Sequence, residues 1–122
     1  MASDAFSTPR AQLLDFFGAD RVSEKQLADG RYVFRIKDVP LPPGCRPGTT
    51  PVLVVYSNPA ATPEVFVDQG IILATGKAPR NMNRQTVDGE ALASFSANYP
   101  WNPAEGVSLY VMRRLWRFRQ PD

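Results

Sequence analysis

The side chains of this sequence that could do covalent chemistry are mainly hydroxyls, because the 122-residue chain contains no histidine and a single cysteine. Without histidine, neither a Ser-His-Asp nor a Cys-His catalytic arrangement can form, and zinc sites that contain histidine are excluded as well. The sequence also lacks the GxxxxGKS/T pattern that binds triphosphates and the GxGxxG pattern that binds dinucleotides. We therefore predict neither a metal site nor a cofactor.

The candidate catalytic residues precede the last predicted helix, and they are Ser96, Ser94, Thr86 and Asn98. A serine or threonine can carry an acyl group as an oxyester when a base or a polarised environment activates it. The nearby bases are Asp88, Glu90 and Lys77, and the amide of Asn98 could donate to a developing oxyanion. Ser96 is the first choice because it is two residues from Asn98. The alternative is that these hydroxyls cap turns or face solvent.

Cys45 is the only thiol, and it lies in a proline-rich loop beside Arg46. A neighbouring arginine can favour the thiolate, so Cys45 is a second candidate for carrying an acyl group. The alternative is a small buried cysteine with no chemical role. A single cysteine excludes a disulfide within the chain, which agrees with a reducing compartment.

The stretch from Ala104 to Arg119 has apolar residues at helical spacing. We predict a C-terminal helix that starts near Pro103, because proline at the first helical position removes an N–H that would be unpaired there anyway. The expected apolar face consists of Val107, Val111, Leu115 and Phe118, with Met112 at its edge.

Four other residues of this helix are candidates for binding a protein partner: Trp116, Arg113, Arg114 and Arg117. The three arginines are expected to fall together on one face, with Trp116 off the apolar face beside them. Tryptophan and arginine are enriched among the residues that dominate binding energy at interfaces. The alternative is an ordinary solvated face of a packed helix.

Composition bounds the class of protein. The chain has 14 basic and 12 acidic residues, so its net charge of +2 makes nucleic acid an unlikely partner. No stretch approaches the roughly 20 apolar residues of a membrane span, and the first residues do not resemble a signal peptide. We expect one soluble, cytoplasmic domain that covers residues 1–122.

The pattern along the chain predicts an α+β fold. Thr8-Pro9 is expected to start a first helix that Gly18 ends. Asp29-Gly30 predicts a hairpin turn between two antiparallel strands, the first over 21–27 and the second over 31–37. Two further strands, over 52–56 and 65–67, complete an expected four-stranded antiparallel meander.

The second half of the sequence has a weaker pattern. Gly76 to Asp88 is polar and without period, which predicts a long loop, and such loops tend to be functional. Glu90 to Ala97 is expected to form one or two helical turns. Trp101 is expected to fill the core beneath this segment rather than to stack on a ligand.

Four short motifs occur in an order that resembles a known superfamily. They are the PLPPG of residues 40–44, the apolar strand over 52–56, Phe95-Ser96-Ala97-Asn98, and Pro100-Trp101-Asn102-Pro103. Together with a helix, a four-strand meander and a Trp-x-Pro before a helix, they make the chain similar to the ubiquitin-conjugating enzyme fold. The closest resemblance is to the prokaryotic family E of ubiquitin-conjugating-enzyme-like proteins, over about residues 8–118.

The resemblance implies a component of a bacterial ubiquitin-like conjugation pathway, with a ubiquitin-like protein and an activating-enzyme-like protein as partners. Ordinary members carry the cargo on a cysteine between the fourth strand and the tryptophan, but this chain has no cysteine from Gly70 to Trp101. Family E lacks that cysteine and typically has a histidine where Asn98 stands here. The resemblance thus implies a non-classical transferase that holds its cargo as an oxyester, or an inactive variant that binds the ubiquitin-like protein or the activating enzyme as a scaffold.

Overall fold

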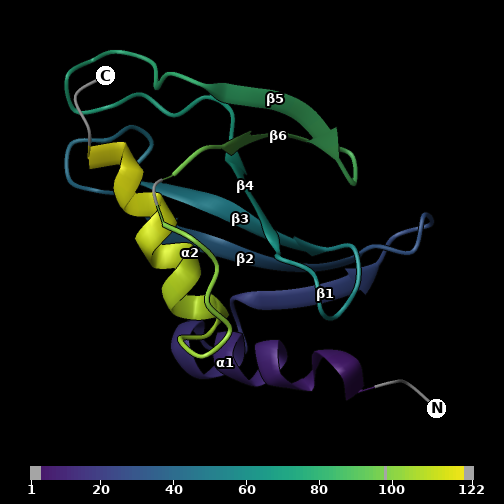
Figure 1. Cartoon of the computed structure of the whole chain (residues 1–122). Helices are drawn as coiled ribbons and strands as arrows, with labels where there is room; N and C mark the ends of the chain where they lie inside the picture. The colour runs from purple at the N-terminus through teal and green to yellow at the C-terminus, as the bar shows by residue number, and fades with distance from the viewer. Residues whose placement is uncertain (1–3, 98, 120–122) are drawn as a thin grey trace.

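The computed structural model describes residues 4–97 and 99–119, and it has an α+β architecture (Figure 1). Two α-helices, two 3-10 helices and six strands follow one another in this order: η1 (Asp4–Phe6), α1 (Ser7–Phe17), β1 (Val22–Gln26), β2 (Tyr32–Pro40), β3 (Thr49–Tyr56), β4 (Glu64–Asp68), β5 (Met82–Val87), β6 (Glu90–Phe95), α2 (Val107–Leu115) and η2 (Trp116–Arg119). Both α-helices lie on one side of the sheet (Figure 1).

The six strands form one antiparallel sheet in the order β1-β2-β3-β4-β6-β5. The four predicted strands are present and neighbour one another in sequence order, and β1 and β2 form the hairpin that Asp29-Gly30 predicted. The expected total of four strands is wrong, because a second hairpin, β5–β6, extends the sheet beyond β4.

This second hairpin replaces two predicted features. Part of the expected loop over 76–88 is strand β5, and the expected helical turns over 90–97 are strand β6. Asp88 and Gly89 make the turn with φ of 50° and 79°, the positive angles that a two-residue hairpin needs. β6 pairs on both sides, with β4 and with β5, and this pairing outweighs the helix propensity of Ala91-Leu92-Ala93.

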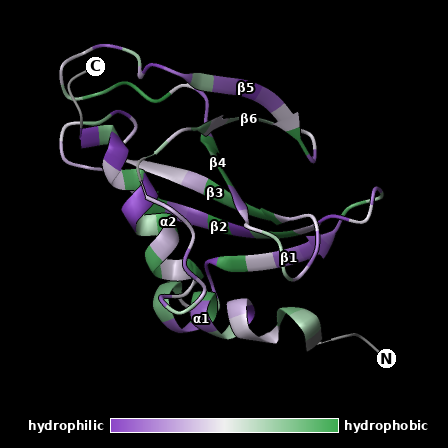
Figure 2. Ribbon diagram, viewed as in Figure 1, coloured by the Kyte–Doolittle hydropathy of each residue, from purple (hydrophilic) through white to green (hydrophobic). Residues whose placement is uncertain are grey.

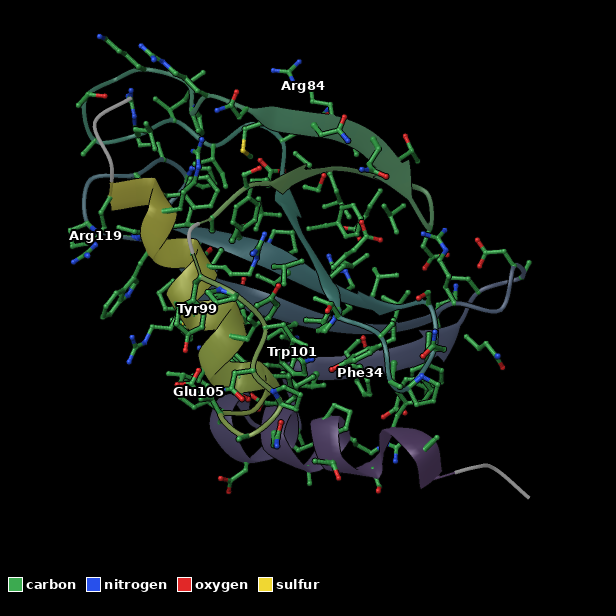
Figure 3. All side chains as sticks on the ribbon, viewed as in Figure 1. Phe34, Arg84, Tyr99, Trp101, Glu105 and Arg119 are labelled. Atoms are coloured by element: carbon green, nitrogen blue, oxygen red, sulfur yellow. The ribbon has the colours of Figure 1, made fainter. Side chains whose placement is uncertain are left out.

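The main core lies between the sheet and the two helices. Leu13 of α1 and Val107, Val111 and Leu115 of α2 pack against the inner side chains of the sheet, among them the fully buried Phe34. The predicted apolar face of the last helix is therefore confirmed. Trp101 is half-buried, packs against this core and contacts the Tyr110 ring edge-on at 5.0 Å, which confirms its predicted packing role (Figure 3).

A second, smaller core lies on the other face of the sheet. Its buried residues come from β2, β3, β4 and the tip of the β5–β6 hairpin: Val33, Leu53, Val55, Phe66, Val87 and Leu92. Two ion pairs hold the hairpin tip over this core, Arg35 with Glu90 at 2.9 Å and Lys25 with Asp88 at 3.0 Å. The sheet thus curls over its own outer face, while most of β5 remains hydrophilic (Figure 2).

The start of the last helix differs from the prediction. Helix α2 begins at Val107 rather than near Pro103, after Gly106 with a φ of 88°. No side chain next to the helix caps it; instead Gln12 of α1 accepts a hydrogen bond from the Val107 N–H at 2.9 Å through Oε1, and its carbonyl accepts one from the Ser108 hydroxyl. The helix also tightens into 3-10 geometry at Trp116, so the expected single helix to Arg119 is in two parts.

Helix α1 matches its predicted position but not its predicted start. It runs from Ser7 to Phe17, and the Gly18 N–H donates to the Leu14 carbonyl at 2.9 Å, so the expected end is confirmed. The residue that precedes it is Phe6, which provides no side-chain cap, so the predicted cap by Thr8 is wrong. Phe6 instead stacks on Tyr32 at 4.4 Å, and this ring contact fixes where the helix enters the fold.

Candidate functional site

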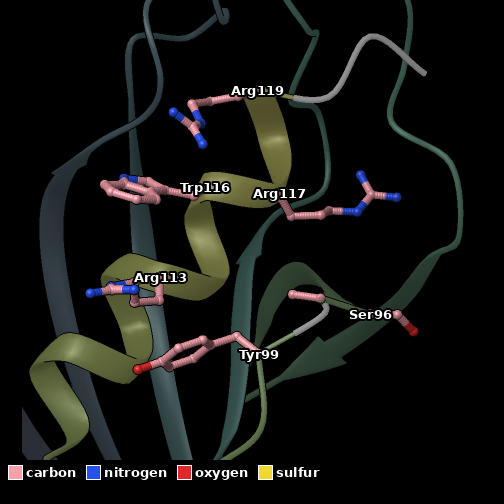
Figure 4. Close-up of a pocket in the computed structure, with 7 residues that line it drawn as sticks. Ser96, Tyr99, Arg113, Trp116, Arg117 and Arg119 are labelled. Atoms are coloured by element: carbon pink, nitrogen blue, oxygen red, sulfur yellow. The ribbon is translucent and has the colours of Figure 1, made fainter. Parts of the chain in front are cut away.

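The exposed side of the last helix carries a stack of alternating aromatic and arginine side chains, Tyr99, Arg113, Trp116 and Arg119, which we call the arginine–aromatic stack (Figure 4). The Arg113 guanidinium carbon lies 5.5 Å from the Tyr99 ring centroid and 5.6 Å from that of Trp116. The Arg119 guanidinium lies 4.6 Å from the other side of Trp116. Two guanidinium groups therefore enclose one indole.

Helix geometry explains the stack. Arg113, Trp116 and Arg119 are spaced by three residues, which places them above one another on a helix surface. The change to 3-10 geometry at Trp116 aligns residues three apart even more closely, because that helix has three residues per turn. Each guanidinium over the ring gains about 0.5–1 kcal/mol at an exposed site, so the side chains are held in place before any partner arrives.

Tyr99 is itself held at the end of the stack. Its hydroxyl donates a hydrogen bond to Glu105 Oε1 at 2.5 Å, and this bond to a carboxylate raises the pKa of Tyr99 above its ordinary value (Figure 3). The neighbouring Arg113 acts in the opposite direction on that pKa, to a smaller extent. Tyr99 therefore remains a neutral phenol beside a fixed cation.

The stack borders a surface hollow of about 600 Å³, which we call the basic hollow. Its lining residues are Ser96, Ala97, Tyr99, Arg113, Trp116, Arg117 and Arg119. These described lining residues include three arginines and no carboxylate. Within residues 4–97 and 99–119, neither Arg113 nor Arg119 forms an ion pair. The hollow is suited to a negatively charged group.

The predicted arginines separate in the structure. Arg113 belongs to the stack, and Arg117 borders the basic hollow from the opposite side, where its guanidinium donates to the Arg80 carbonyl and lies 5.5 Å from the Phe118 ring (Figure 4). Arg117 therefore ties the segment before β5 to the end of the helix. Trp116 is 49% exposed, as the prediction of a residue off the core face requires.

Arg114 points away from the stack and is half-buried. Its guanidinium donates to the Phe95 carbonyl at 2.7 Å and lies 5.4 Å from the Phe95 ring and 5.2 Å from that of Tyr110. The pairing between β4 and β6 stops at Phe66 and Ser94, so the Phe95 carbonyl needs another donor. Arg114 supplies it, and the structure does not bring Arg114 together with Arg113.

The same divergence of β4 and β6 opens a second surface hollow, of about 480 Å³, which we call the polar hollow. Two predicted catalytic residues line it, Ser94 at the end of β6 and Ser96 just beyond, together with Arg114, Glu64 and Asn83. The Ser94 hydroxyl accepts a hydrogen bond from Gln85 at 3.4 Å. Ser96 is exposed and lines both hollows.

Of the other predicted catalytic residues, Thr86 does not join these serines. Thr86 pairs with Ala91, three residues along β6 from Ser94, which is about 10 Å away at the rise of a strand. Asn98 lies outside the described residues. Thr86 is exposed on the edge strand, so of the three candidates that the structure describes it brings together Ser94 and Ser96.

The predicted bases are occupied elsewhere. Glu90 accepts two hydrogen bonds from Arg35, and this interaction lowers the pKa of Glu90, which weakens it as a base. Asp88 pairs with Lys25 at the hairpin tip. Lys77 is an exposed residue of the segment between β4 and β5. None of the three lines the polar hollow, where Glu64 is the described carboxylate.

Cys45 is buried, with 6% of its surface exposed. Its Sγ donates to the Phe118 carbonyl at 3.6 Å, and burial raises the pKa of the thiol. The suggested thiolate beside Arg46 is therefore not favoured, and Cys45 is buried, as the alternative expects.

Two residues of the site were not among the predicted ones. Arg119 covers the second face of Trp116, and Tyr99 ends the stack. The spacing of three between Arg113, Trp116 and Arg119 is visible in the sequence and would have included Arg119. Nothing in the sequence marks Tyr99, because its position depends on how residues 96–105 return to the helix.

No protein-family model matches this sequence, and no curated protein and no solved structure matches it either. Among the helices of the described residues, none is long and apolar enough to cross a membrane. The same part of the chain contains no cluster of three or more cysteine, aspartate or glutamate residues placed to hold a metal ion.

Proposed function

We propose that this chain is a ubiquitin-conjugating-enzyme-like, cytoplasmic component of a bacterial ubiquitin-like conjugation pathway that binds the ubiquitin-like protein or its activating enzyme without carrying the cargo covalently. The order of α1, the strands β1 to β4 as sequential neighbours, the Trp101-Asn102-Pro103 motif and α2 supports the family part of the proposal. The arginine–aromatic stack supports the binding part.

The single observation that carries the binding role is the exposed Trp116 between two guanidinium groups that have no carboxylate partner in the described chain. An exposed tryptophan with fixed arginines is the composition of an interface hot spot. A charged surface held in place before binding loses little side-chain entropy when a partner arrives. These properties favour recognition of a protein surface.

A titration of the ubiquitin-like protein and of the activating enzyme into the purified chain tests this role. Trp116→Ala and Arg113→Glu should each weaken binding by about 2 kcal/mol or more, near 30-fold, with the melting temperature little changed. Arg84→Glu is the matched control, because Arg84 is an exposed arginine on β5, away from the stack (Figure 3). Equal loss in Arg84→Glu, or no binding of either protein, would contradict the proposal.

A second candidate function is transfer of the cargo through an oxyester on a hydroxyl. The polar hollow favours it, because Ser94 and Ser96 lie there together with the fixed guanidinium of Arg114 and with Glu64. Ser96 is the first choice and Ser94 the second, with Thr86 behind them.

Mass spectrometry after incubation with activating enzyme, ATP and the ubiquitin-like protein separates the two functions. Transfer predicts an adduct that hydroxylamine removes, that thiol reductants leave intact and that Ser96→Ala abolishes. Cys45→Ser should leave that adduct unchanged, because the thiol is buried. A chain that shows no adduct while the activating enzyme is charged has only the binding role.

A further inference from the structure

Trp116 separates the basic hollow from a third hollow of a different chemistry. This apolar hollow has a volume of about 340 Å³ and is lined by Pro40, Leu41, Pro42, Pro43, Met112, Leu115, Trp116 and Arg119. Trp116 and Arg119 line both hollows, so they form a ridge between them. This ridge therefore borders two hollows whose other lining residues differ in chemistry, basic in one and apolar in the other.

The apolar hollow suits a large aliphatic or aromatic side chain. Three prolines and two aliphatic side chains make up most of its wall, and none of its described lining residues is acidic. The proline-rich segment that starts at Pro40 has few backbone conformations, so its shape is fixed before binding. Desolvating an apolar side chain against such a wall is favourable, whereas a charged group would lose its hydration there.

The basic hollow suits carboxylates. The guanidinium groups over Trp116 pair with no carboxylate of the described residues, so their N–H donors are available to a carboxylate in a bidentate arrangement. The separation of the Arg113 and Arg119 guanidinium carbons cannot exceed the sum of 5.6 and 4.6 Å, so both are within reach of neighbouring acidic side chains of one segment.

We propose that the ridge of Trp116 and Arg119 binds an acidic protein segment that contains one large apolar residue. The apolar side chain enters the proline-lined hollow, and flanking carboxylates pair with Arg113 and Arg119 across the indole. This inference deepens the proposed function and rests on it for the identity of the natural partner, since it states which segment of that partner is recognised.

The stack argues against a nucleic acid as the occupant. Single-stranded nucleic acids bind through bases that stack on exposed aromatic faces. A guanidinium already lies on each side of the Trp116 ring, and the neighbouring hollow is lined mainly by prolines and aliphatic side chains. An acidic peptide uses both hollows, whereas a nucleotide would leave the apolar one empty.

Fluorescence polarisation with a fluorescein-labelled peptide, Glu-Glu-Leu-Glu-Glu, tests the inference on the full chain. Two matched peptides, one with serine in place of leucine and one with glutamine in place of every glutamate, should each bind at least about tenfold more weakly. Raising the salt from 50 to 200 mM should also weaken binding of the acidic peptide, because the pairs are at the surface. Equal affinity for the acidic and the glutamine peptide would overturn the proposal.

Variants of the chain locate the site. Arg119→Ala and Arg113→Ala should each weaken binding of the acidic peptide about tenfold, and Arg119→Lys should restore only part of it, because lysine keeps the charge without the stacked planar fork. Arg84→Ala removes an exposed arginine from β5 and should change affinity less than twofold. A similar loss in Arg84→Ala and Arg119→Ala would show non-specific charge attraction and contradict the site.

Nuclear magnetic resonance measures peptide binding on the unmodified chain, and a variant is needed only to assign the signals. The chain has two tryptophans, so its spectrum holds two indole N–H signals, and Trp116→Phe assigns them. Peptide addition should shift the Trp116 signal and leave that of Trp101, which packs against the core, in place. A shift of Trp101 alone, or tighter binding of an oligothymidylate than of the acidic peptide, would overturn the proposal.

The peptide experiments test the ridge, and the titrations with the ubiquitin-like protein and the activating enzyme test the proposed function, so the two can fail separately. If the acidic leucine peptide binds at the ridge but the ubiquitin-like protein and the activating enzyme do not bind, the proposed function is wrong and the recognised chemistry stands. If those proteins bind with an affinity that Arg119→Ala does not change, the proposed function stands and the ridge is not the site.

Discussion

Arginines that pair with carboxylates of the sheet and arginines on the last helix have opposite roles. Arg10 of α1 pairs with Glu24 of β1, and Arg35 of β2 pairs with Glu90 of β6, each through more than one hydrogen bond. On the helix, Arg113 and Arg119 pair with no carboxylate of the described residues and lie on aromatic rings instead.

The difference shows which of these arginines have a carboxylate partner within the described residues and which do not. An arginine that faces a carboxylate of the same chain contributes to holding two strands or a helix and a strand together. An arginine held on an aromatic face keeps its hydrogen-bond donors available to another molecule. Charge without a partner, held in a fixed position, is the feature that separates a binding surface from a structural one.

Arg114 provides a test of this comparison. It follows Arg113 in the sequence, yet its guanidinium donates to a backbone carbonyl, that of Phe95. Arg114→Met, which keeps the aliphatic length, should lower the free energy of unfolding by about 2 kcal/mol, since the Phe95 carbonyl loses a charged donor at a partly buried position. Arg113→Met should change it by about 0.5 kcal/mol. Urea unfolding of the two variants gives both values, and equal changes would show that the two arginines have the same role.

The ion pair at the tip of the β5–β6 hairpin should have a smaller effect on the free energy of unfolding. Arg35→Met and Glu90→Gln should each lower the free energy of unfolding by about 0.5–1 kcal/mol, because the pair is bidentate but more than a third of the arginine side chain is exposed. The double variant should lose less than the sum of the two single ones, as expected for residues in direct contact. A double variant whose loss equals that sum would mean that the pair contributes nothing as a pair.

The acid dependence of stability should follow the paired carboxylates. Hydrogen bonds from Arg10 lower the pKa of Glu24, and those from Arg35 lower that of Glu90, from an ordinary value of 4.5. A lowered pKa stabilises the fold above about pH 4.5, and this contribution is lost as the pH falls through the lower, folded-state value.

Urea unfolding at pH 6 and pH 3 measures this loss. The unsubstituted chain should lose up to about 1 kcal/mol more on acidification than the Glu24→Gln, Glu90→Gln variant, since both groups are partly exposed. The Arg113→Ala, Arg119→Ala variant should follow the unsubstituted chain, because neither arginine has a carboxylate among the described residues. A flatter acid response in that variant would reveal a pairing that contradicts the comparison.

The last prediction concerns the stack itself. Trp116→Ala removes contacts with two guanidinium groups, at about 0.5 kcal/mol each, but opens no cavity because the ring is half-exposed, so the free energy of unfolding should fall by about 1 kcal/mol. Thermal unfolding checks this value. A loss above about 3 kcal/mol would mean that Trp116 belongs to the core and that its exposure is incidental.

How much of the fold could be predicted from the sequence depends on whether the interactions that define each element are local in the chain. Residues 107–118 carry their apolar period in sequence, so the buried face of the last helix followed from spacing alone. The β5–β6 hairpin had one signal, Asp88-Gly89, the same dipeptide that marked the first hairpin at Asp29-Gly30. The strand before it, Met82–Val87, is exposed along most of its length and has no apolar alternation, so periodicity gave no support.

The residues of the candidate site likewise fall into two groups, those placed by local helix spacing and those placed by pairing between distant segments. Trp116 and Arg113 were predictable because neighbours on a helix surface follow from their spacing in sequence. The inward position of Arg114 was not, since it depends on a carbonyl that becomes free only where β4 and β6 diverge. The position of Ser96 between two hollows likewise depends on strand pairing between distant segments.

The cap that Gln12 provides for α2 makes the assembly of this surface a long-range event in folding. The hydrogen bond from the Val107 N–H to Gln12 joins residues 95 positions apart, so closing it requires the intervening sheet to be nearly complete. Contacts of such separation form slowly compared with those inside a helix. A peptide of residues 99–119 alone would lack the partner that starts its helix, and its arginines would sample many orientations in place of the fixed stack.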